Sequence, residues 1–445
     1  MASNLFTISS SGIKAARAAL DITAQNIANA GTEGYVRRSL NLAEMASSLS
    51  YSRVGDLSLS GVRVDTLVRN ADLFRQAEVR RTGADAQRAS TELGGLQNIE
   101  AAVEQAGVYP AMTAFETSLS QLAADPTNTS LRAAALEDAR TLTKTFNIAS
   151  QSLDTVGEGL RFEASDGINQ INLLSGELAR VNLQLTRATP GSSDQAKLLD
   201  SRDNMLQQLS QYGEIKTTIA SDQTVEVRLG DLATPALVAG GNANTLAMAT
   251  DADGLISLTL GGSPVTLSSG SLAGQAQALT AVRDNRATLN GIADDLIAAA
   301  NGAQATGAAL DGSAGQPFFS GSGAAGIALA LTSGSLIATA PLGAAPNSRD
   351  STNLAALRGA LDSHDISGQL DSLLFTVSSA VAGSKVTSDA LSTIASSAKI
   401  ALSEQAGVDL DQEAVNLVRY QQAFQANGKA MQVASDLFDT LLALK

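Results

Sequence analysis

Few residues in this sequence could do chemistry. His364 is the only histidine and there is no cysteine, so the chain cannot assemble a histidine-based triad, a thiol nucleophile, a zinc-thiolate site or a multi-histidine metal site. The loop Asp251-Ala252-Asp253-Gly254 looks like the start of a calcium loop, but the sixth position is not glycine and the twelfth is not glutamate. Gly240-Gly241 and Gly261-Gly262 lack the Lys-Ser/Thr of a phosphate loop. We therefore predict no catalytic residue, no metal and no cofactor, and a protein that is not an enzyme.

The composition indicates closely packed helices. Apolar residues make up 44% of the 445 positions, aromatic residues only 3%, and tryptophan is absent, so the apolar mass is Ala, Leu, Val and Ile. The length allows two or three domains. A formal charge of −14 without a large Lys/Arg cluster excludes nucleic acid as a partner. We also predict no membrane span and no cleaved signal peptide, because no run approaches about 18 apolar residues and no basic segment precedes an apolar stretch at the N-terminus.

A heptad pattern opens the chain. Phe6, Ile13, Leu20 and Ile27 recur every seven residues, which predicts a helix with one apolar seam. The helix is expected to end at Asn29-Ala30-Gly31, because Asn and Gly tolerate the left-handed conformation that closes helices.

Residues 36–69 alternate loosely and are expected to be extended or irregular, and helical periodicity returns with Leu93, Leu96, Ile99 and Val103. Apolar residues between Leu142 and Leu185 follow steps of three and four, which predicts one long helical layer. The segment Thr189-Pro190-Gly191-Ser192-Ser193 breaks this pattern, and Asp194 could cap a return helix, giving an antiparallel helix pair.

The period changes to two after Glu214. Val225-Glu226-Val227-Arg228-Leu229 and Ile256-Ser257-Leu258-Thr259-Leu260 predict strands, the second after a turn at residues 251–254. Residues 276–301 are again helical in pattern, and residues 302–349 are rich in Gly, Ala and Ser, which favours short strands and loops. Helix is predicted from Leu354 to the C-terminus.

The last segment carries a second heptad seam. Leu410, Leu417, Phe424, Met431 and Phe438 recur every seven residues behind a capping-box-like start at Asp409. Such thin seams bury too little surface to stabilise a lone helix, because each ordered residue costs about 1–2 kcal/mol in backbone entropy. The two terminal helices could therefore pack into the core of a monomer or form a surface for assembly, and periodicity alone leaves both interpretations open.

We predict a fold that is mainly α with an inserted β-rich domain, arranged as a discontinuous, layered multidomain protein whose terminal helices pair like a coiled coil. The expected parts are a terminal helical domain, a helical middle domain and a β-rich outer domain with some helix. In residue ranges these are 1–35 and 405–445, then 36–213 and 350–404, then 214–349.

Both ends of the chain carry motifs with a known resemblance. The segment from Asn26 to Arg37, Asn-Ile-Ala-Asn followed by Gly34-Tyr35 and a basic residue, resembles the N-terminal signature of flagellar rod, hook and hook-associated proteins. The segments Val408–Glu413 and Asn416–Asn427 resemble the matching C-terminal signature. Two such signatures at opposite ends of one chain are far more specific than either alone.

The interior resembles the hook-associated members of that family, at Leu198-Leu199-Asp200-Ser201-Arg202-Asp203 and at Ala71–Ala77. This resemblance implies a structural subunit that joins hook to filament and is required for filament assembly, with an extracellular location in the flagellum. It also implies type III export without a cleaved signal, an export chaperone on the C-terminal region, self-association in a ring, and contacts with hook protein and with the next hook-associated protein. Residues 302–349 are shorter than in relatives with a larger outer domain.

The residues expected to form the assembly interface combine the two seams with the two signatures. They are Phe6, Ile13, Leu20, Asn26, Ile27, Asn29, Gly34 and Tyr35 at the N-terminal end, and Leu410, Leu417, Tyr420, Phe424, Asn427, Met431 and Phe438 at the C-terminal end.

Three questions stay open at this point. A hook or distal-rod subunit is an alternative of the same class, and a secreted coiled-coil translocator or adhesin is an alternative of another class. Arg37 and Arg38 are expected either to meet an acidic patch of a neighbouring subunit or to be solvated.

Overall fold

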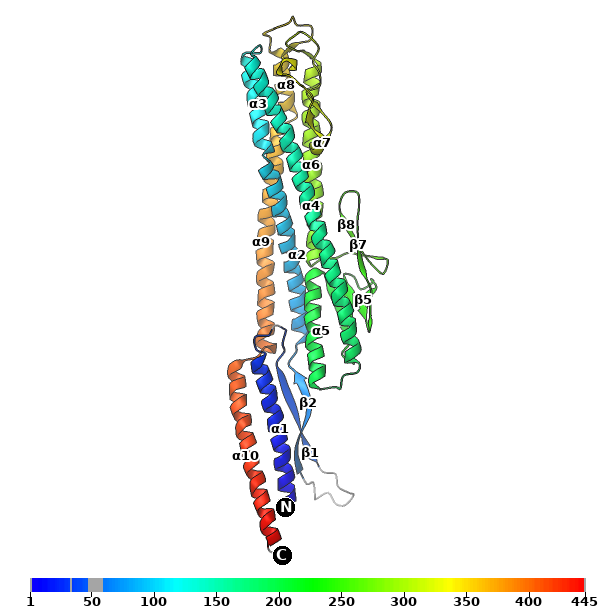
Figure 1. The fold of residues 1–445 in the computed structure, drawn as a ribbon, viewed down its shortest axis with the longest axis vertical. Helices are drawn as coiled ribbons and strands as arrows, with labels where there is room; N and C mark the ends of the chain where they lie inside the picture. The colour runs from blue at the N-terminus through cyan, green and yellow to red at the C-terminus, as the bar shows by residue number, and fades with distance from the viewer. Residues whose placement is uncertain (1, 33, 47–58, 444–445) are drawn as a thin grey trace.

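The spine of the molecule is helix α4, Thr129–Leu185, which has 57 residues and at 1.5 Å per residue is about 85 Å long. The Asn128 side chain caps it by accepting hydrogen bonds from the backbone N–H groups of Ser130 and Leu131. Most of the apolar residues that recur in steps of three and four, such as Phe146, Leu153 and Leu178, lie on its buried face, so the predicted helical layer is confirmed as one continuous helix. The computed structural model describes residues 2–32, 34–46 and 59–443 and shows an elongated, mainly helical molecule (Figure 1).

Other helices run alongside α4 and form a bundle (Figure 1). The predicted return helix is α5; its cap is Ser192, whose hydroxyl accepts from the Gln195 N–H, and not Asp194 as the sequence suggested. The helices of the bundle besides α4 are α2 Leu73–Ala106, α3 Val108–Ala124, α5 Ser193–Tyr212, α6 Ser271–Ala305, α8 Thr352–Ser363 and α9 Ile366–Ala406.

Two small antiparallel sheets lie beside the lower half of α4 and α5 (Figure 1). β4 and β8 coincide with the two strands predicted from alternation. Their inward residues, such as Val227 and Leu260, form one hydrophobic core with α4 residues such as Ile171. The strands of these sheets are β3 Ile215–Ile219, β4 Val225–Leu229, β5 Ala236–Ala239, β6 Asn242–Ala243, β7 Leu246–Thr250, β8 Ile256–Leu260 and β9 Ser263–Val265.

A second core fills the upper half of the bundle. Phe115 meets Phe318 and Phe319 edge to face at ring-centroid distances of 5.6 and 6.1 Å, which is a favoured aromatic geometry. Short elements between α6 and α8 cover this end (Figure 1). They are β10 Gly307–Ala308, β11 Phe319–Ser320, α7 Gly323–Gly326, β12 Ala328–Leu329, the 3-10 turn Gly334–Leu336 and β13 Ala340–Pro341.

The boundaries of these parts differ from the expected domains. Residues 214–349 were expected to form one β-rich outer domain, but α6 packs in the bundle against α2 and α4, and the segment after α6 belongs to the upper core. The alternation of strands and helix in sequence could not reveal this, because the two halves of the region contact different ends of α4. The mainly helical class with a β-containing region is confirmed.

The two chain ends lie together at the lower end of the molecule (Figure 1). α1, Ala2–Ala28, runs antiparallel to α10, Leu410–Ala443, and a two-stranded hairpin packs along α1. The hairpin pairs β1 Arg38–Ala46 with β2 Leu59–Arg69, so Arg38 lies opposite Arg69 at its base. It falls within residues 36–213, which were expected to belong to the middle domain, yet it packs on a terminal helix. We call α1, this hairpin and α10 the terminal unit.

Across residues 2–32, 34–46 and 59–443, no helix has the length and apolar character needed to cross a membrane. In the same described residues, no group of three or more His, Asp or Glu side chains is arranged to hold a metal ion.

Candidate assembly site

Small residues allow α1 and α10 to approach each other closely. A Cβ atom at Gly12 would lie 2.4 Å from Oδ1 of Asn427, so any larger residue at this crossing would have to displace the Asn427 side chain. The buried positions of α1 are also small or polar: Ser9, Ala15, Ala16, Ala19, Thr23 and Asn26. The backbone of α1 is therefore held close to its neighbours without burial of its large side chains.

The large residues of the predicted N-terminal seam lie at the edge of this contact. Ile13 and Leu20 are partly buried, whereas Phe6 is 50% exposed and Ile27 is 37% exposed. The heptad pattern thus found the apolar stripe, but the side of α1 that is buried within the chain is the adjacent stripe of small residues.

The C-terminal seam is similarly half open. Leu417, Tyr420, Asn427 and Met431 are partly buried, and the remaining members Leu410, Phe424 and Phe438 are 53%, 40% and 53% exposed. The cap predicted at Asp409 is confirmed, since its carboxylate accepts from the N–H groups of Asp411 and Gln412 at 2.9 and 3.1 Å.

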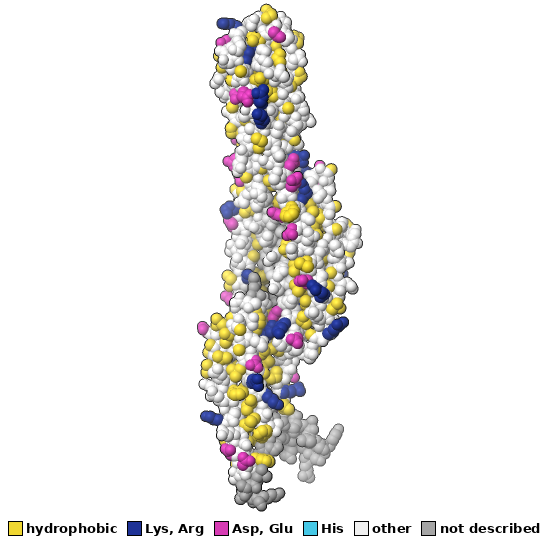
Figure 2. Space-filling view, viewed as in Figure 1, with side chains coloured by type: hydrophobic (Ala, Val, Ile, Leu, Met, Phe, Trp, Pro, Cys, Tyr) yellow, Lys and Arg dark blue, Asp and Glu magenta, His cyan; other side chains and the backbone are white. Residues whose placement is uncertain are grey.

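Further large apolar side chains of the terminal unit face solvent. Figure 2 shows yellow side chains gathered over its visible face. Besides the seam residues, at least 37% of the surface is exposed for Leu5, Ile8, Leu42, Met45, Val64, Val68, Val415, Val418, Val433 and Leu437. Neither of the two hydrophobic cores of the described chain contains a residue of α1 or α10. An open apolar surface of this extent is typical of a protein–protein interface.

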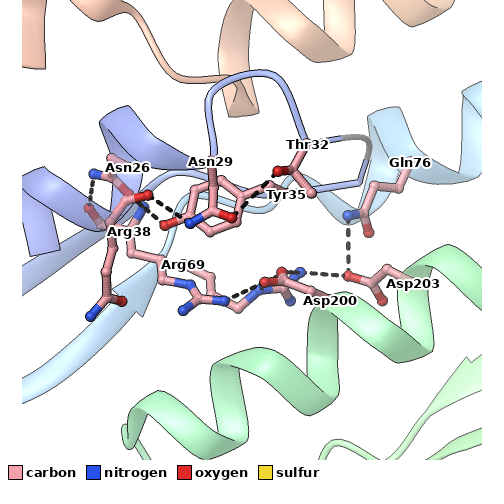
Figure 3. A network of polar contacts seen from close by, with 10 residues as sticks. Asn26, Asn29, Thr32, Tyr35, Arg38, Arg69, Gln76, Asp200 and Asp203 are labelled. Atoms are coloured by element: carbon pink, nitrogen blue, oxygen red, sulfur yellow. Dashed lines mark hydrogen bonds and ion pairs between the residues drawn. The ribbon is translucent and has the colours of Figure 1, made fainter.

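The N-terminal signature forms a hydrogen-bonded turn that is anchored by the buried side chain of Asn26 (Figure 3). Asn26, 1% exposed, accepts at Oδ1 from the Tyr35 hydroxyl at 2.9 Å and from the Arg38 N–H at 3.1 Å, and donates from Nδ2 to the Arg38 carbonyl at 2.9 Å. Asn29 bonds locally, to the Gln25 carbonyl and the Thr32 hydroxyl. The signature thus acts first inside the chain, by folding the segment after α1 back onto α1.

Gly34 and Tyr35 complete this turn. Gly34 has φ of 78°, in the left-handed region where a residue without Cβ is favoured. The Arg38 guanidinium lies over the Tyr35 ring at 4.9 Å from its centroid, and burial raises the pKa of the Tyr35 hydroxyl.

A network of buried charges joins the terminal unit to the bundle (Figure 3). Asp200 on α5 accepts from the Arg38 guanidinium and from Arg69 at 2.7 Å. Asp203, one turn further on, accepts from Arg69 at 2.9 Å, from Arg202 at 2.7 Å and from the Gln76 amide at 3.2 Å. The three guanidinium side chains are at most 8% exposed, so these ion pairs are screened far less than surface pairs.

The carboxyl group of Asp203 is held in its charged form. Burial alone would raise its pKa, but the charges of Arg202 and Arg69 and their hydrogen bonds outweigh burial, so the pKa lies below the ordinary value.

A second set of contacts joins the other side of the terminal unit to α9 and, within the unit, ties the segment before β1 to α10. Arg37 donates from Nε to Glu413 at 2.7 Å, and its backbone N–H donates to the Ala406 carbonyl. Gln405 accepts from the side chains of Asn70 and Arg75 at 2.6 and 2.7 Å. Glu413 is only 1% exposed.

Arg37 and Arg38 therefore differ from both sequence interpretations. Their partners are carboxylates of the same chain, and Arg38 is buried. Asp200, Asp203, Arg69 and Glu413 were missed as functional candidates, although Asp200 and Asp203 lie in a segment that carried the resemblance. A signal was present: the N-terminal signature ends in Arg37 and is followed by Arg38, and the carboxylate of Glu413 stands within the C-terminal signature.

Known families match three separate parts of the chain. The flagellar hook-associated protein FlgK helical domain matches residues 93–319, which is just over half of the chain. The flagella basal body rod protein family matches residues 6–35, and the flagellar basal body rod FlgEFG protein C-terminal family matches residues 401–444. The last two matches cover α1 with the signature turn, and α10.

Individual relatives agree with this match. The chain is 24% identical to flagellar hook-associated protein 1 of Bacillus subtilis over 488 residues, which covers 97% of this chain and 96% of that protein. It is 26% identical to flagellar hook-associated protein 1 of Salmonella typhimurium over 250 residues, which covers 55% of this chain and 44% of that protein. The solved flagellar hook junction protein FlgK from Burkholderia pseudomallei is similar at a TM-score of 0.49 and 22% identity, over 55% of this chain and 46% of that chain.

The chain belongs to the flagellar hook-associated protein FlgK family. It is a hook-associated structural subunit of the bacterial flagellum, and its family is one of structural proteins that associate with other flagellar components.

Proposed function

We propose that this chain is a subunit of the junction between hook and filament, and that its terminal unit forms the contact between subunits. The observation that carries this proposal is the open apolar surface of α1, the hairpin and α10, outside both cores of the described chain. Family membership supports the location in the flagellum.

Burial of this surface would supply the binding energy. A large apolar side chain contributes about 1.5–3 kcal/mol when it goes from exposed to buried. Phe6, Val418, Phe424 and Phe438 are each 40–53% exposed, so each retains a substantial part of that contribution for a neighbouring copy. In the assembled state, α1 and α10 of adjacent copies pack as a coiled-coil-like layer, and the bundle forms the next layer.

The same proposal includes the partners and route that the resemblance implies. The subunits associate in a ring, with hook protein on one side and the next hook-associated protein on the other. An export chaperone holds the C-terminal region before type III export, and the subunit leaves the cell without a cleaved signal. The role is one of packing, with no catalytic activity.

A hook or distal-rod subunit is the second candidate. The rod-protein families that match residues 6–35 and 401–444 favour it. The match of residues 93–319 to the FlgK helical domain favours the junction, because those residues form most of the helical bundle.

Deletion of the gene is expected to leave hooks without filaments in electron micrographs, and the full-length chain supplied from a plasmid is expected to restore them. A rod or hook subunit would give a different image, since hooks themselves would be absent. Normal filaments in the deletion strain would contradict both candidates.

A further inference from the structure

The terminal unit is attached to the bundle on two sides. In Figure 1, α5 lies on one side of the hairpin, and α9 with the start of α10 lies on the other. The α5 side is joined by ion pairs to Asp200 and Asp203. The other side is joined to α9, where the Arg37 N–H donates to the Ala406 carbonyl and the Asn70 side chain donates to the Gln405 carbonyl. A change in the tilt of the terminal unit would have to break the contacts of one side.

Asp200 holds the base of the hairpin. Its two partners, Arg38 and Arg69, are the first residue of β1 and the last residue of β2, and they lie directly opposite each other in the ladder. One carboxylate of the bundle therefore binds both strands at the point where they leave the bundle. Asp200 is 16% exposed, and its partners are 4% and 8% exposed.

The neighbouring carboxylate has different partners. Asp203 is bound by Arg69 of the hairpin, but also by Arg202 of its own helix and Gln76 of α2, so it keeps partners within the bundle wherever the hairpin lies. In the part of the chain that the structure describes, the ion-pair partners of Asp200 all belong to the hairpin. We call the contact between the terminal unit and the bundle the joint. Asp200 is thus the carboxylate whose ion pairs act only at this joint.

We propose that Asp200 is a positioning residue for assembly, because it sets the angle at which the terminal unit leaves the bundle. The link to assembly rests on the proposed function, but the angle is a property of the single chain. Without the Asp200 carboxylate, the base of the hairpin keeps one ion pair to α5, from Arg69 to Asp203, while the hydrogen bonds to Ala406 and Gln405 of α9 stay. The terminal unit then swings about that second side.

The absence of cysteine makes this angle measurable. Spin labels can be attached to Lys14→Cys in α1 and Gln208→Cys in α5, which are both exposed positions. Pulsed electron paramagnetic resonance between them reports the distance between the terminal unit and the bundle. In the full-length chain we expect one narrow distance distribution. Asp200→Asn is expected to broaden it at least twofold. Asp200→Glu should restore most of the narrowness, and Asp194→Asn, an exposed carboxylate of the same helix, should leave it unchanged.

Melting curves of the same variants separate positioning from stability. Broadening in Asp200→Asn that Asp200→Glu reverses supports the proposal, and a lower melting temperature of Asp200→Asn alone is compatible with it, because Arg38 then lacks its carboxylate. A distribution as narrow as that of the parent chain would overturn it, as would a broad distribution in the parent chain. An equal fall in melting temperature in Asp200→Asn and Asp200→Glu would also overturn it, by assigning Asp200 to fold stability. The spin labels are measured in unassembled protein, so a negative result would contradict the role of Asp200 without contradicting the proposed function at the hook–filament junction. Normal filaments in the deletion strain would contradict the proposed function without contradicting the role of Asp200 in setting the angle.

Discussion

Phe424→Asp is expected to abolish filament attachment while the soluble chain melts as before. Phe424 is 40% exposed on α10, and α10 contributes no residue to either core of the described chain. An aspartate is therefore tolerated in the single chain, where water reaches it. In the assembled ring the same charge would be buried without a partner, which costs several kcal/mol at each interface. Since about 1.4 kcal/mol corresponds to a factor of ten in binding, filaments per cell should fall by more than about tenfold.

The matched control is Gln425→Asp, a change at the adjacent exposed position that removes no apolar side chain. It should keep most filaments. Thermal unfolding of both purified variants accompanies the filament count by electron microscopy. A large fall in the melting temperature of Phe424→Asp would favour the interpretation in which the terminal helices belong to the core of a monomer. Intact filaments with unchanged melting would mean that Phe424 lies outside the interface.

Asp203→Ala is expected to destabilise the lower half of the bundle strongly. Asp203 is the carboxylate shared by Arg202 and Arg69, which are 1% and 8% exposed. Removal of one partner of a buried pair leaves the other charge uncompensated and costs about 3–5 kcal/mol. α5 also supplies Leu206 and Leu209 to the core beside the two sheets. Displacement of α5 by the Asp203 substitution should therefore lower the urea concentration at which this part of the chain unfolds. Asp166→Ala, an exposed carboxylate on α4, should change stability by less than about 0.5 kcal/mol.

The pH dependence of this difference gives an independent check. The pKa of Asp203 is lowered, so its contribution is present above the ordinary carboxyl pKa of about 3.9 and is lost as the pH falls through the folded pKa. The stability difference between parent chain and Asp203→Ala should stay constant from about pH 8 to 5 and shrink only below about pH 4. A difference that already shrinks between pH 7 and 5 would contradict the lowered pKa. The charged groups that act on Asp203 are Arg202 on α5, Arg69 on β2 and Arg80 on α2.

Local patterns predicted the elements of this fold well. Steps of three and four gave α4, and strict alternation gave β4 and β8 at their observed ends. These patterns succeed because each element buries one face against a large core. The same reasoning assigned α6 to the outer domain, whereas it packs in the bundle. The pattern of a helix that follows strands in the sequence does not indicate which other helices it packs against.

The joint could not be predicted, for a physical reason. Its ion pairs connect residues that are 131 to 162 positions apart in the chain, such as Arg69 with Asp200 and Arg38 with Asp200. Periodicity reports on the surroundings of one helix or strand, and it holds no information on which distant charge completes a buried pair. The apolar seams were predicted, but the face of α1 that is buried within the chain was not. That face carries small residues such as Gly12, which form the contact with α10.

The most direct test of the account is the accessibility of the terminal unit in intact flagella. Val418→Cys would place a single thiol on α10 at a position that is 51% exposed in the single chain. Ala252→Cys would place one in the exposed turn between β7 and β8. Both should react quickly with a maleimide in the purified protein. In isolated flagella, the account predicts that the thiol at position 418 is protected at least tenfold more than the thiol at position 252. Equal reactivity of the two thiols in assembled flagella would contradict the claim that the terminal unit forms the contact between subunits.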